Sequence, residues 1–476
     1  MNYKKKIMKR ENRTYFFYQN RISLILFILI QLSCIGKAYA QTTGFGNITI
    51  NNTTTNSSKG KWTTVGTVYT FTPTAIGSNV NMTDIQTYLG TTGTTEVIIS
   101  TACAFCTESG IITVSSSVTS LKPVASSILK LKAEKNININ AVIDLGIKEG
   151  TERIDVNSPS IEFISNNGNI ISSSTAAISN NPITGQTSGY IKFTANNGYV
   201  QIMGAITTTS STNGGPVTII GNAGVTISAN ITTSGGSTGI LSITDNNSSV
   251  SISPAEVSNQ GQTNGIIAVG SFEKLGTGVF QLKGANVWSG NTTISAGYLK
   301  LGANNSVPIT SSIVFNGGYY QPNGFNSTVK TFRILADSYI TFDAAQSSTI
   351  TFDSVLYNST ANKYLTIVGW QGFSSTTALS KYGSLKSSST ASDFVTTNGA
   401  LQNVTNPGGL TQYGQVITSS EGGTGGLKGK IYASSILTRT PLATTIGKIQ
   451  FLNGTTPYTS IQISTKEIIP GIAKQP

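Results

Sequence analysis

The sequence of 476 residues contains no histidine, which excludes reactions that depend on an imidazole. Ser-His-Asp triads and histidine general bases both require that side chain. Charged residues are also scarce, at 11% of the chain. Eight of the 31 basic residues and one of the 19 acidic residues fall in residues 1–40, which leaves a net charge of +5 on the remainder. The chain therefore lacks the concentrated basic stripe that nucleic-acid binding requires, and we expect no nucleic-acid partner.

Cysteine is nearly absent, with three residues in the chain. Cys103 and Cys106 form a Cys-Ala-Phe-Cys sequence, which in a cytosolic α/β protein would suggest redox chemistry or half of a zinc site. Here no second cysteine pair and no βαβ pattern accompany it. We therefore favour a local disulfide between Cys103 and Cys106, on an exposed turn in an oxidising compartment, with two free thiols as the alternative. The sequence predicts no metal site and no cofactor, because it also lacks a glycine-rich phosphate loop and a calcium repeat.

Residues 1–40 have the features of a secretory signal peptide, with a basic start, an apolar centre and an Ala-Tyr-Ala cleavage sequence. The apolar run Ile22–Leu32 is about half of the roughly twenty residues needed to span a bilayer, so we expect cleavage between Ala40 and Gln41 rather than a membrane anchor. Lipidation of Cys34 is a weaker alternative, because a glutamine replaces the aliphatic residue of that signal. No second long apolar segment follows, and the mature chain is expected to have no transmembrane helix.

The chain is rich in glycine, threonine, serine and asparagine, and these alternate with β-branched residues in a repeat. Each copy has the form apolar-x-apolar, a turn of Asn and Gly, then apolar-x-apolar and often a third apolar position. Alternation places the apolar residues on one face, which stacked copies can bury together but a single copy cannot. Asn and Gly at the turns are expected to supply positive φ angles. The copies begin at Val97, Leu129, Ile161, Ile191, Val217 and Leu241.

This pattern predicts an all-β fold, a right-handed parallel β-helix (β-solenoid), although alternation alone would also fit a string of β-sandwiches. Residues 41–95 are expected to form an N-terminal cap and the first strands, because an open end would expose unpaired strand edges. Residues 96–345 are expected to form the repeats, and residues 346–476 the irregular β-rich C-terminal end of the solenoid. The five repeat starts from Leu129 to Leu241 are predicted to form one buried ladder.

Two stretches resemble known exported proteins. Residues 80–86, with Asp84 before Ile85, and the rungs that follow resemble the large filamentous-haemagglutinin-type adhesins. Residues 272–302 resemble the autotransporter-associated β-strand repeat, which occurs in passenger proteins as a structural unit associated with export. We expect no translocator or sorting domain in this chain, so the export route does not follow from the resemblance. The residues that carry the second resemblance are Leu275, Gly276, Gly278, Leu282, Gly284, Asn286, Gly290, Thr293, Ile294, Gly297 and Leu299.

These features lead us to expect an exported, adhesin-like passenger, secreted or displayed on the outer membrane or cell surface of a bacterium. Its β-helical rod would bind an unidentified ligand, such as a glycan or a cell-surface or matrix component, with the export machinery as a further partner. We expect no enzymatic activity and no catalytic residue. A structural coat or matrix component that binds nothing is one alternative.

The other alternative is an exported carbohydrate-active enzyme, a polysaccharide lyase or glycoside hydrolase, because parallel β-helices can carry paired carboxylates. If 340–342 and 350–352 are successive strands, Asp343 and Asp353 fall at equivalent ends of them, with Asp337 and Arg333 nearby. We prefer to interpret these acids as strand-end turn residues. The three tryptophans are isolated in the sequence, and Trp288 and Trp370 are expected to pack in the core or at corners.

Overall fold

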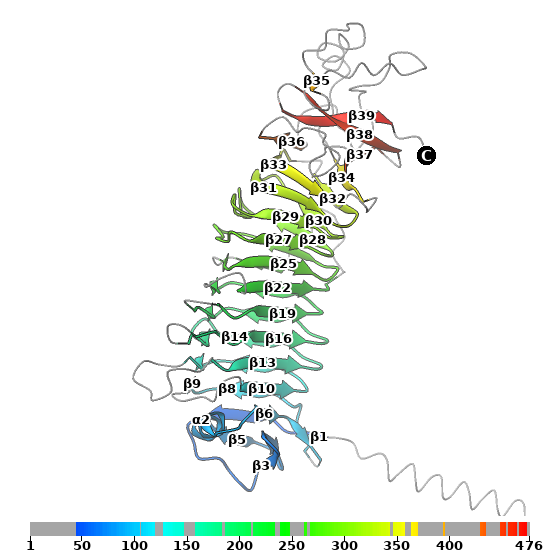
Figure 1. Cartoon of the computed structure of the whole chain (residues 1–476). Coiled ribbons are helices and arrows are strands. Elements are labelled where there is room, and N and C mark those ends of the chain that lie inside the picture. The colour runs from blue at the N-terminus through cyan, green and yellow to red at the C-terminus, as the bar shows by residue number, and fades with distance from the viewer. Residues whose placement is uncertain are drawn as a thin grey trace, which may run out of the picture.

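The computed structural model shows the protein as a rod of stacked β-strands that runs from a blue N-terminal end to a red C-terminal end (Figure 1). The described part contains one α-helix, α2 (Met82–Gly90), and is otherwise built from strands, as the abundance of β-branched residues predicts. The structure describes residues 44–104, 106–119, 127–146, 158–182, 186–210, 213–233, 239–247, 261–263, 267–342, 346–357, 363–369, 394–395, 429–434, 448–453, 456–463 and 466–473.

The longest sheet, sheet 1, follows the rod along its length. Its first two strands are antiparallel, and every later neighbour in it is parallel. In spatial order its strands are β3 (Gly60–Val65), β4 (Val68–Pro73), β6 (Glu96–Ser100), β10 (Ile128–Ala133), β13 (Ser160–Ser165), β16 (Ile191–Ala195), β19 (Val217–Gly221), β22 (Ile240–Asp245), β25 (Ser271–Leu275), β27 (Asn291–Ile294), β29 (Ser312–Phe315), β31 (Ser327–Ile334), β33 (Thr349–Tyr357) and β36 (Lys430–Ala433).

A second sheet, sheet 2, also continues from rung to rung with parallel neighbours. In spatial order its parallel strands are β5 (Ser78–Asn81), β2 (Ile48–Asn51), β8 (Ile112–Val114), β11 (Ile137–Ile139), β14 (Ile170–Ser172), β17 (Val200–Ile202), β20 (Val225–Ile227), β23 (Gly261–Thr263), β26 (Val279–Leu282), β28 (Tyr298–Leu301), β30 (Tyr319–Gln321), β32 (Ser338–Thr341), β34 (Leu365–Val368) and β37 (Ile449–Asn453). At the irregular C-terminal end β38 (Thr456–Ile463) joins it antiparallel, beside β39 (Ile468–Ala473) and β35 (Phe394–Val395).

Sheet 3 is short and occupies only part of the rod. Its six strands are β9 (Val118–Thr119), β12 (Ile143–Asp144), β15 (Ile178–Ser179), β18 (Ile206–Thr207), β21 (Ile231–Thr232) and β24 (Ile267–Ala268). From β6 to β24 the chain visits sheets 1, 2 and 3 in rotation, apart from β7 (Ala102–Cys103), which lies outside these sheets, and from β25 to β34 it alternates between sheets 1 and 2. The fold is therefore a parallel β-helix. We call residues 96–268 the three-sheet segment and residues 271–368 the two-sheet segment.

The inward ladder predicted from the repeat is confirmed. Its five members are paired in successive strands of sheet 1, and each is buried: Leu129, Ile161, Ile191, Val217 and Leu241. Val97 extends the ladder by one rung toward the N-terminus and Phe272 by one rung toward the C-terminus. Stacking places each apolar side chain about 4.8 Å from its counterpart and removes both from water.

The expected conformation of the Asn-Gly turns is wrong at Gly168 and Gly198, because neither glycine has a positive φ angle. A side chain at Gly198 would approach the carbonyl oxygen of Gly168 to 2.0 Å, so close stacking of the turns selects glycine there. The asparagines pair between rungs instead: the Asn197 Nδ2 donates to the Asn167 Oδ1 at 2.7 Å. The turns thus form an exposed ladder of side-chain amides.

The N-terminal end of the rod is covered. Helix α2 begins after Asn81, whose side chain accepts a hydrogen bond from the Thr83 N–H, and buries Ile85 and Leu89 against the first rungs. The antiparallel strand β3 closes the edge of sheet 1. Strand β2 lies between β5 and β8, although both follow it in the chain. The antiparallel β3 thus pairs the first edge of sheet 1, and helix α2 covers the first rungs.

Candidate functional site

The segment between β6 and β8 carries Cys103 and Cys106, which form a disulfide with Cα atoms 5.5 Å apart. Both side chains are buried, at 7% and 4% exposure, so the prediction of an exposed turn is wrong. The cause is the N-terminal segment, which crosses over the loop: β1 (Gly44–Phe45) pairs antiparallel with β7 (Ala102–Cys103). A side chain at Gly44 would approach the Cys106 carbonyl oxygen to 2.0 Å, so the two backbones are in close contact.

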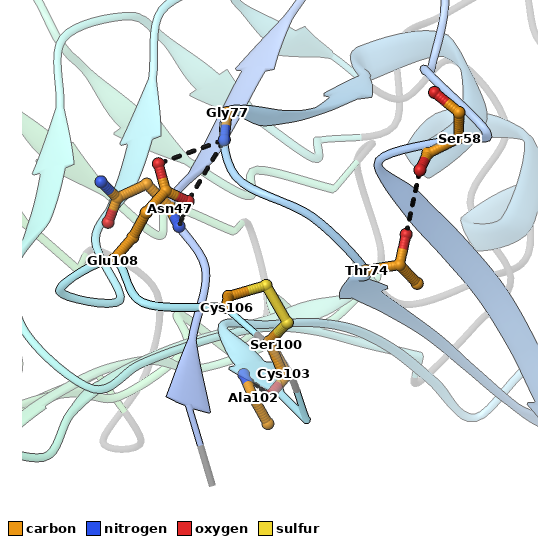
Figure 2. The surroundings of a disulfide bond; sticks show 9 residues. All are labelled: Asn47, Ser58, Thr74, Gly77, Ser100, Ala102, Cys103, Cys106 and Glu108. Atoms are coloured by element: carbon orange, nitrogen blue, oxygen red, sulfur yellow. Dashed lines mark hydrogen bonds between the residues drawn. A yellow bond between two sulfur atoms is a disulfide. The ribbon is translucent and has the colours of Figure 1, made fainter. Parts of the chain in front are cut away.

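Glu108 completes the attachment of the N-terminal segment to this loop. Its carboxylate accepts hydrogen bonds from the Asn47 N–H at 2.7 Å and from the Gly77 N–H at 3.1 Å (Figure 2). The Asn47 side chain in turn accepts the Ile111 N–H at 2.8 Å. Hydrogen bonds to an ionised acceptor are stronger than those between neutral groups. Disulfide and carboxylate together hold β1 and β2 in place, which is a structural role.

The strands expected to carry the paired carboxylates are not neighbours in one sheet. Asp343 lies outside the described residues, but the two strands assumed to be successive are both described. Ile340 pairs with Tyr320 in sheet 2, whereas Ile350 pairs with Ser327 in sheet 1. Asp353 is the fifth residue of β33, which runs from Thr349 to Tyr357, and is exposed. The equivalence of the two acids is therefore wrong, and so is the assignment of Asp353 to a strand end.

The other acids and Arg333 are placed apart from one another. Asp144 ends β12 and accepts hydrogen bonds from the Ser179 hydroxyl and the Gly146 N–H. Asp337 precedes β32; slight burial raises its pKa, but hydrogen bonds from the Lys363 ammonium and the Tyr364 N–H outweigh this and leave the pKa below its usual value. Arg333 is exposed on β31. No cluster of three metal-ligating side chains occurs among the described residues.

The residues of the predicted β-strand repeat form one turn and one corner of the two-sheet segment. Trp288 is buried, as predicted, and stacks on Phe272 with ring centroids 5.5 Å apart. Its indole N–H donates to the hydroxyls of Thr292 and Ser311 at 2.9 and 3.1 Å. Trp370 lies outside the described residues. The remaining repeat residues lie in β25–β28 and their connections: Leu275, Gly276, Gly278, Leu282, Gly284, Gly290, Thr293, Ile294, Gly297 and Leu299.

Asn286 closes the C-terminal edge of sheet 3. Its side-chain oxygen accepts the Ile267 N–H at 3.0 Å, and its amide donates to the Ser306 carbonyl at 2.7 Å. The next residue, Val287, pairs with Ala268 as an isolated bridge. The last strand of sheet 3, β24, is therefore hydrogen-bonded to the corner at Asn286 and Val287. The rung that contains this corner has no strand in sheet 3.

A buried lysine occupies an inward position at the same junction. Lys274 aligns with Ile243 and Ile294, and its ammonium donates to the carbonyl oxygens of Leu275 and Gly276. Burial lowers its pKa to about 8, although the nearby Asp245 acts in the opposite direction. Burial also raises the pKa of Asp245, whose carboxylate accepts two backbone N–H groups. Both shifts favour the neutral forms, so desolvation exceeds the attraction between the two charges.

A column of tyrosines crosses sheet 2 on its outer face. Tyr298, Tyr319 and Tyr339 are aligned in register in β28, β30 and β32. Their rings stack with centroids 4.4 and 4.7 Å apart and remain partly exposed. Partial burial raises the pKa of Tyr298 and of Tyr319 above the usual value, and the neighbouring ring adds to both shifts. We call these three residues the tyrosine column.

Three of these features could not be predicted from the sequence. The tyrosine column was visible as tyrosines 21 and 20 residues apart, but this spacing has meaning only once the rungs are aligned. Lys274 stands at an inward position of its repeat, where a lysine looks like an interruption of the apolar pattern. Glu108 had no local signal, because its partners Asn47 and Gly77 lie 61 and 31 residues away.

In comparisons with known proteins, no family model, no curated protein and no solved structure matches the chain. The predicted cleavage residues Ala40 and Gln41 lie outside the described residues, as does Cys34. No helix in the described part is long and apolar enough to cross a membrane.

Proposed function

We propose that the protein is an exported, adhesin-like binding protein whose β-helical rod presents its outer faces to a glycan or to a cell-surface or matrix component. The observation that carries the proposal is the alignment of outward side chains, such as the tyrosine column, in register across successive rungs. Such a surface contacts an extended partner at many points, and linked weak contacts add up to useful avidity.

Export is supported by two features that do not depend on each other. The leader ends in a cleavage sequence before Gln41. The disulfide between Cys103 and Cys106 requires an oxidising compartment to form and persist. The proposal therefore places the mature chain outside the cytosol, secreted or on the bacterial surface.

The proposed function is binding without turnover. The chain has no histidine, and the two strands expected to carry a pair of glycosidase acids belong to different sheets. No specific observation favours an enzymatic function, so we name no second one.

The test is an adhesion assay run beside a turnover assay on the purified mature chain. Soluble protein would be added to surfaces coated with bacterial or host glycans and with extracellular matrix, and the same glycans would be screened for degradation. We expect saturable binding and no degradation. Degradation abolished by Asp353→Asn would contradict the proposal, and so would a folded chain that binds none of the surfaces, which would favour a structural coat.

A further inference from the structure

We propose that the tyrosine column is the binding surface for a linear, neutral, hydroxyl-rich polysaccharide that lies along the rod. This inference rests on the proposed function and names the ligand class for it. The starting point is the spacing: Tyr298, Tyr319 and Tyr339 repeat at the separation of adjacent parallel strands, about 4.8 Å. A ligand that uses all three must itself repeat over a short distance along one direction, as an extended polymer does.

The groups available to a ligand are hydroxyls and ring edges. The three ring planes lie within 21° of each neighbour, so each ring covers a face of the next. A sugar therefore cannot stack on the faces between them. In the described part of the chain, none of the three phenol hydroxyls has a protein hydrogen-bond partner. Each remains able to donate one hydrogen bond and to accept others.

Two other tyrosines of the rod differ from the column in the partners of their hydroxyls. The Tyr190 hydroxyl donates to the Glu162 carboxylate at 2.6 Å, and the buried Tyr320 hydroxyl donates to the Ser327 hydroxyl at 2.6 Å. Those phenols are satisfied by the protein itself. The column instead holds three stacked phenols in fixed positions with their polar ends unused, so little side-chain entropy remains to be lost on binding.

The outward strand positions around the column favour a neutral ligand, and the exposed Asp337 carboxylate beside β32 is paired with the Lys363 ammonium at 2.9 Å. The outward positions of β26, β28, β30, β32 and β34 contain no carboxylate, and the one basic residue there, Lys300, is 7% exposed. The partly exposed Gln321 and Thr341 flank the column with further hydrogen-bonding groups. Alternating donors and acceptors without net charge match the hydroxyls of a neutral glycan. The outward positions are Val279, Gln281, Tyr298, Lys300, Tyr319, Gln321, Tyr339, Thr341, Thr366 and Val368.

The experiment is calorimetric titration of the mature protein with cellohexaose, chitohexaose and mannohexaose, and with hyaluronate as an anionic comparison. The triple variant Tyr298→Phe, Tyr319→Phe, Tyr339→Phe keeps the stacked rings and removes the three hydroxyls. We expect it to lose at least about tenfold in affinity for the neutral oligosaccharide that binds best. The matched control is Tyr199→Phe, an exposed tyrosine of the three-sheet segment, which should bind like the wild type.

The outcomes separate this inference from the proposed function. An unchanged affinity in the triple variant overturns the inference and leaves the adhesin-like function in place. Salt-sensitive binding of hyaluronate alone overturns it in the same way, because charge would then be the recognised feature. A chain that adheres to matrix protein but to no glycan also overturns only the inference. A chain that adheres to nothing overturns the proposed function itself. Thermal unfolding of each variant checks that the rungs are intact.

Discussion

The three-sheet and two-sheet segments continue one rod with different amounts of chain. Aligned residues of sheet 1 are 24 to 32 positions apart from Val97 to Phe272, and 19 to 23 apart from Phe272 to Val355. Sheets 1 and 2 keep their parallel pairing through the change. The difference is sheet 3, which requires additional residues in each rung and ends at Ala268.

The core side chains change with the number of walls. In the three-sheet segment the largest fully buried side chains are Phe163 and Phe193, stacked on each other among isoleucine and valine. In the two-sheet segment the corresponding residues are Phe272, Phe280, Phe315, Tyr320, Phe332 and Phe352, together with Lys274. Because protein interiors are packed to nearly constant density, larger side chains compensate for the missing wall. Sheets 1 and 2 are therefore sufficient to form a rung, and sheet 3 is an addition found only in the three-sheet segment.

The largest effect is expected from a charge placed in the core that both segments share. Ile219→Asp buries an unpaired carboxylate between the aligned Phe193 and Ile243. We expect a loss of more than about 4 kcal/mol, or local unfolding of several rungs of the three-sheet segment. Urea denaturation measures it. Thr218→Asp, on the outward position beside it, is the matched control and should cost little. Equal effects of the two variants would mean that the inward ladder is misplaced.

A second change removes the corner that replaces sheet 3. Trp288→Ala should cost about 3 to 5 kcal/mol, because it leaves a large cavity beside Phe272 and removes the indole N–H that the hydroxyls of Thr292 and Ser311 accept. Asn286→Ala should cost about 1 to 3 kcal/mol, because the Ile267 N–H loses its acceptor. Chemical denaturation of both variants gives these values. Val287→Thr, 62% exposed at the same corner, should be nearly neutral; a cost comparable to that of Trp288→Ala would contradict this account of the corner.

The buried lysine at the junction predicts a pH dependence. The folded pKa of Lys274 is about 8 against 10.5 in the unfolded chain, so between these values the unfolded chain binds more protons. The free energy of unfolding should therefore rise with pH from about 8 upward, by on the order of 3 kcal/mol in total. Tyrosines with raised pKa oppose this rise above about pH 10, since their folded forms hold protons longer.

The measurement compares variants over pH 7.5 to about 9.5 by urea denaturation. Lys274→Met should remove the rise, whereas the outward Lys192→Met should retain it. If both variants keep the wild-type slope, Lys274 is not buried as an ammonium group at this junction.

The smallest effect is expected at the N-terminal end. The double variant Cys103→Ser, Cys106→Ser removes a very short covalent loop, which should cost at most about 2 kcal/mol. Its effect should be local, with faster hydrogen exchange in β2 and β8 and unchanged exchange in the two-sheet segment. Exchange measured by mass spectrometry decides this. Faster exchange throughout the rod would show that the cap controls the stability of the whole solenoid.

The regular part of the fold was predictable because its signal is local and repeated. Alternation of Val217 and Ile219 with polar residues identifies an inward face in any single copy, and the order of the copies gives the ladder. The end of sheet 3 was not predictable, because each of its strands spans two residues with one buried apolar position, such as Ile206 or Ile231. In the sequence, the absence of one such apolar position looks the same as a change in the length of a loop.

The features around the ends and outer faces depend on distant partners. The burial of Cys103 and Cys106 follows from residues 44–47 folding across their loop, which no local pattern indicates. The predicted pairing of Asp343 with Asp353 failed because neighbouring strands in the chain belong to different sheets of the two-sheet segment. The tyrosine column likewise becomes a surface only through the register of β28, β30 and β32.

The most direct test of the account measures a distance across both segments. Lys192 and Arg333 occupy one outward column of sheet 1 and are separated by six parallel steps that include the loss of sheet 3. Spin labels on Lys192→Cys and Arg333→Cys, read by pulsed electron paramagnetic resonance, should give a narrow distribution near about 29 Å. A distance far from this value, or a broad distribution, would contradict a single continuous rod of stacked rungs.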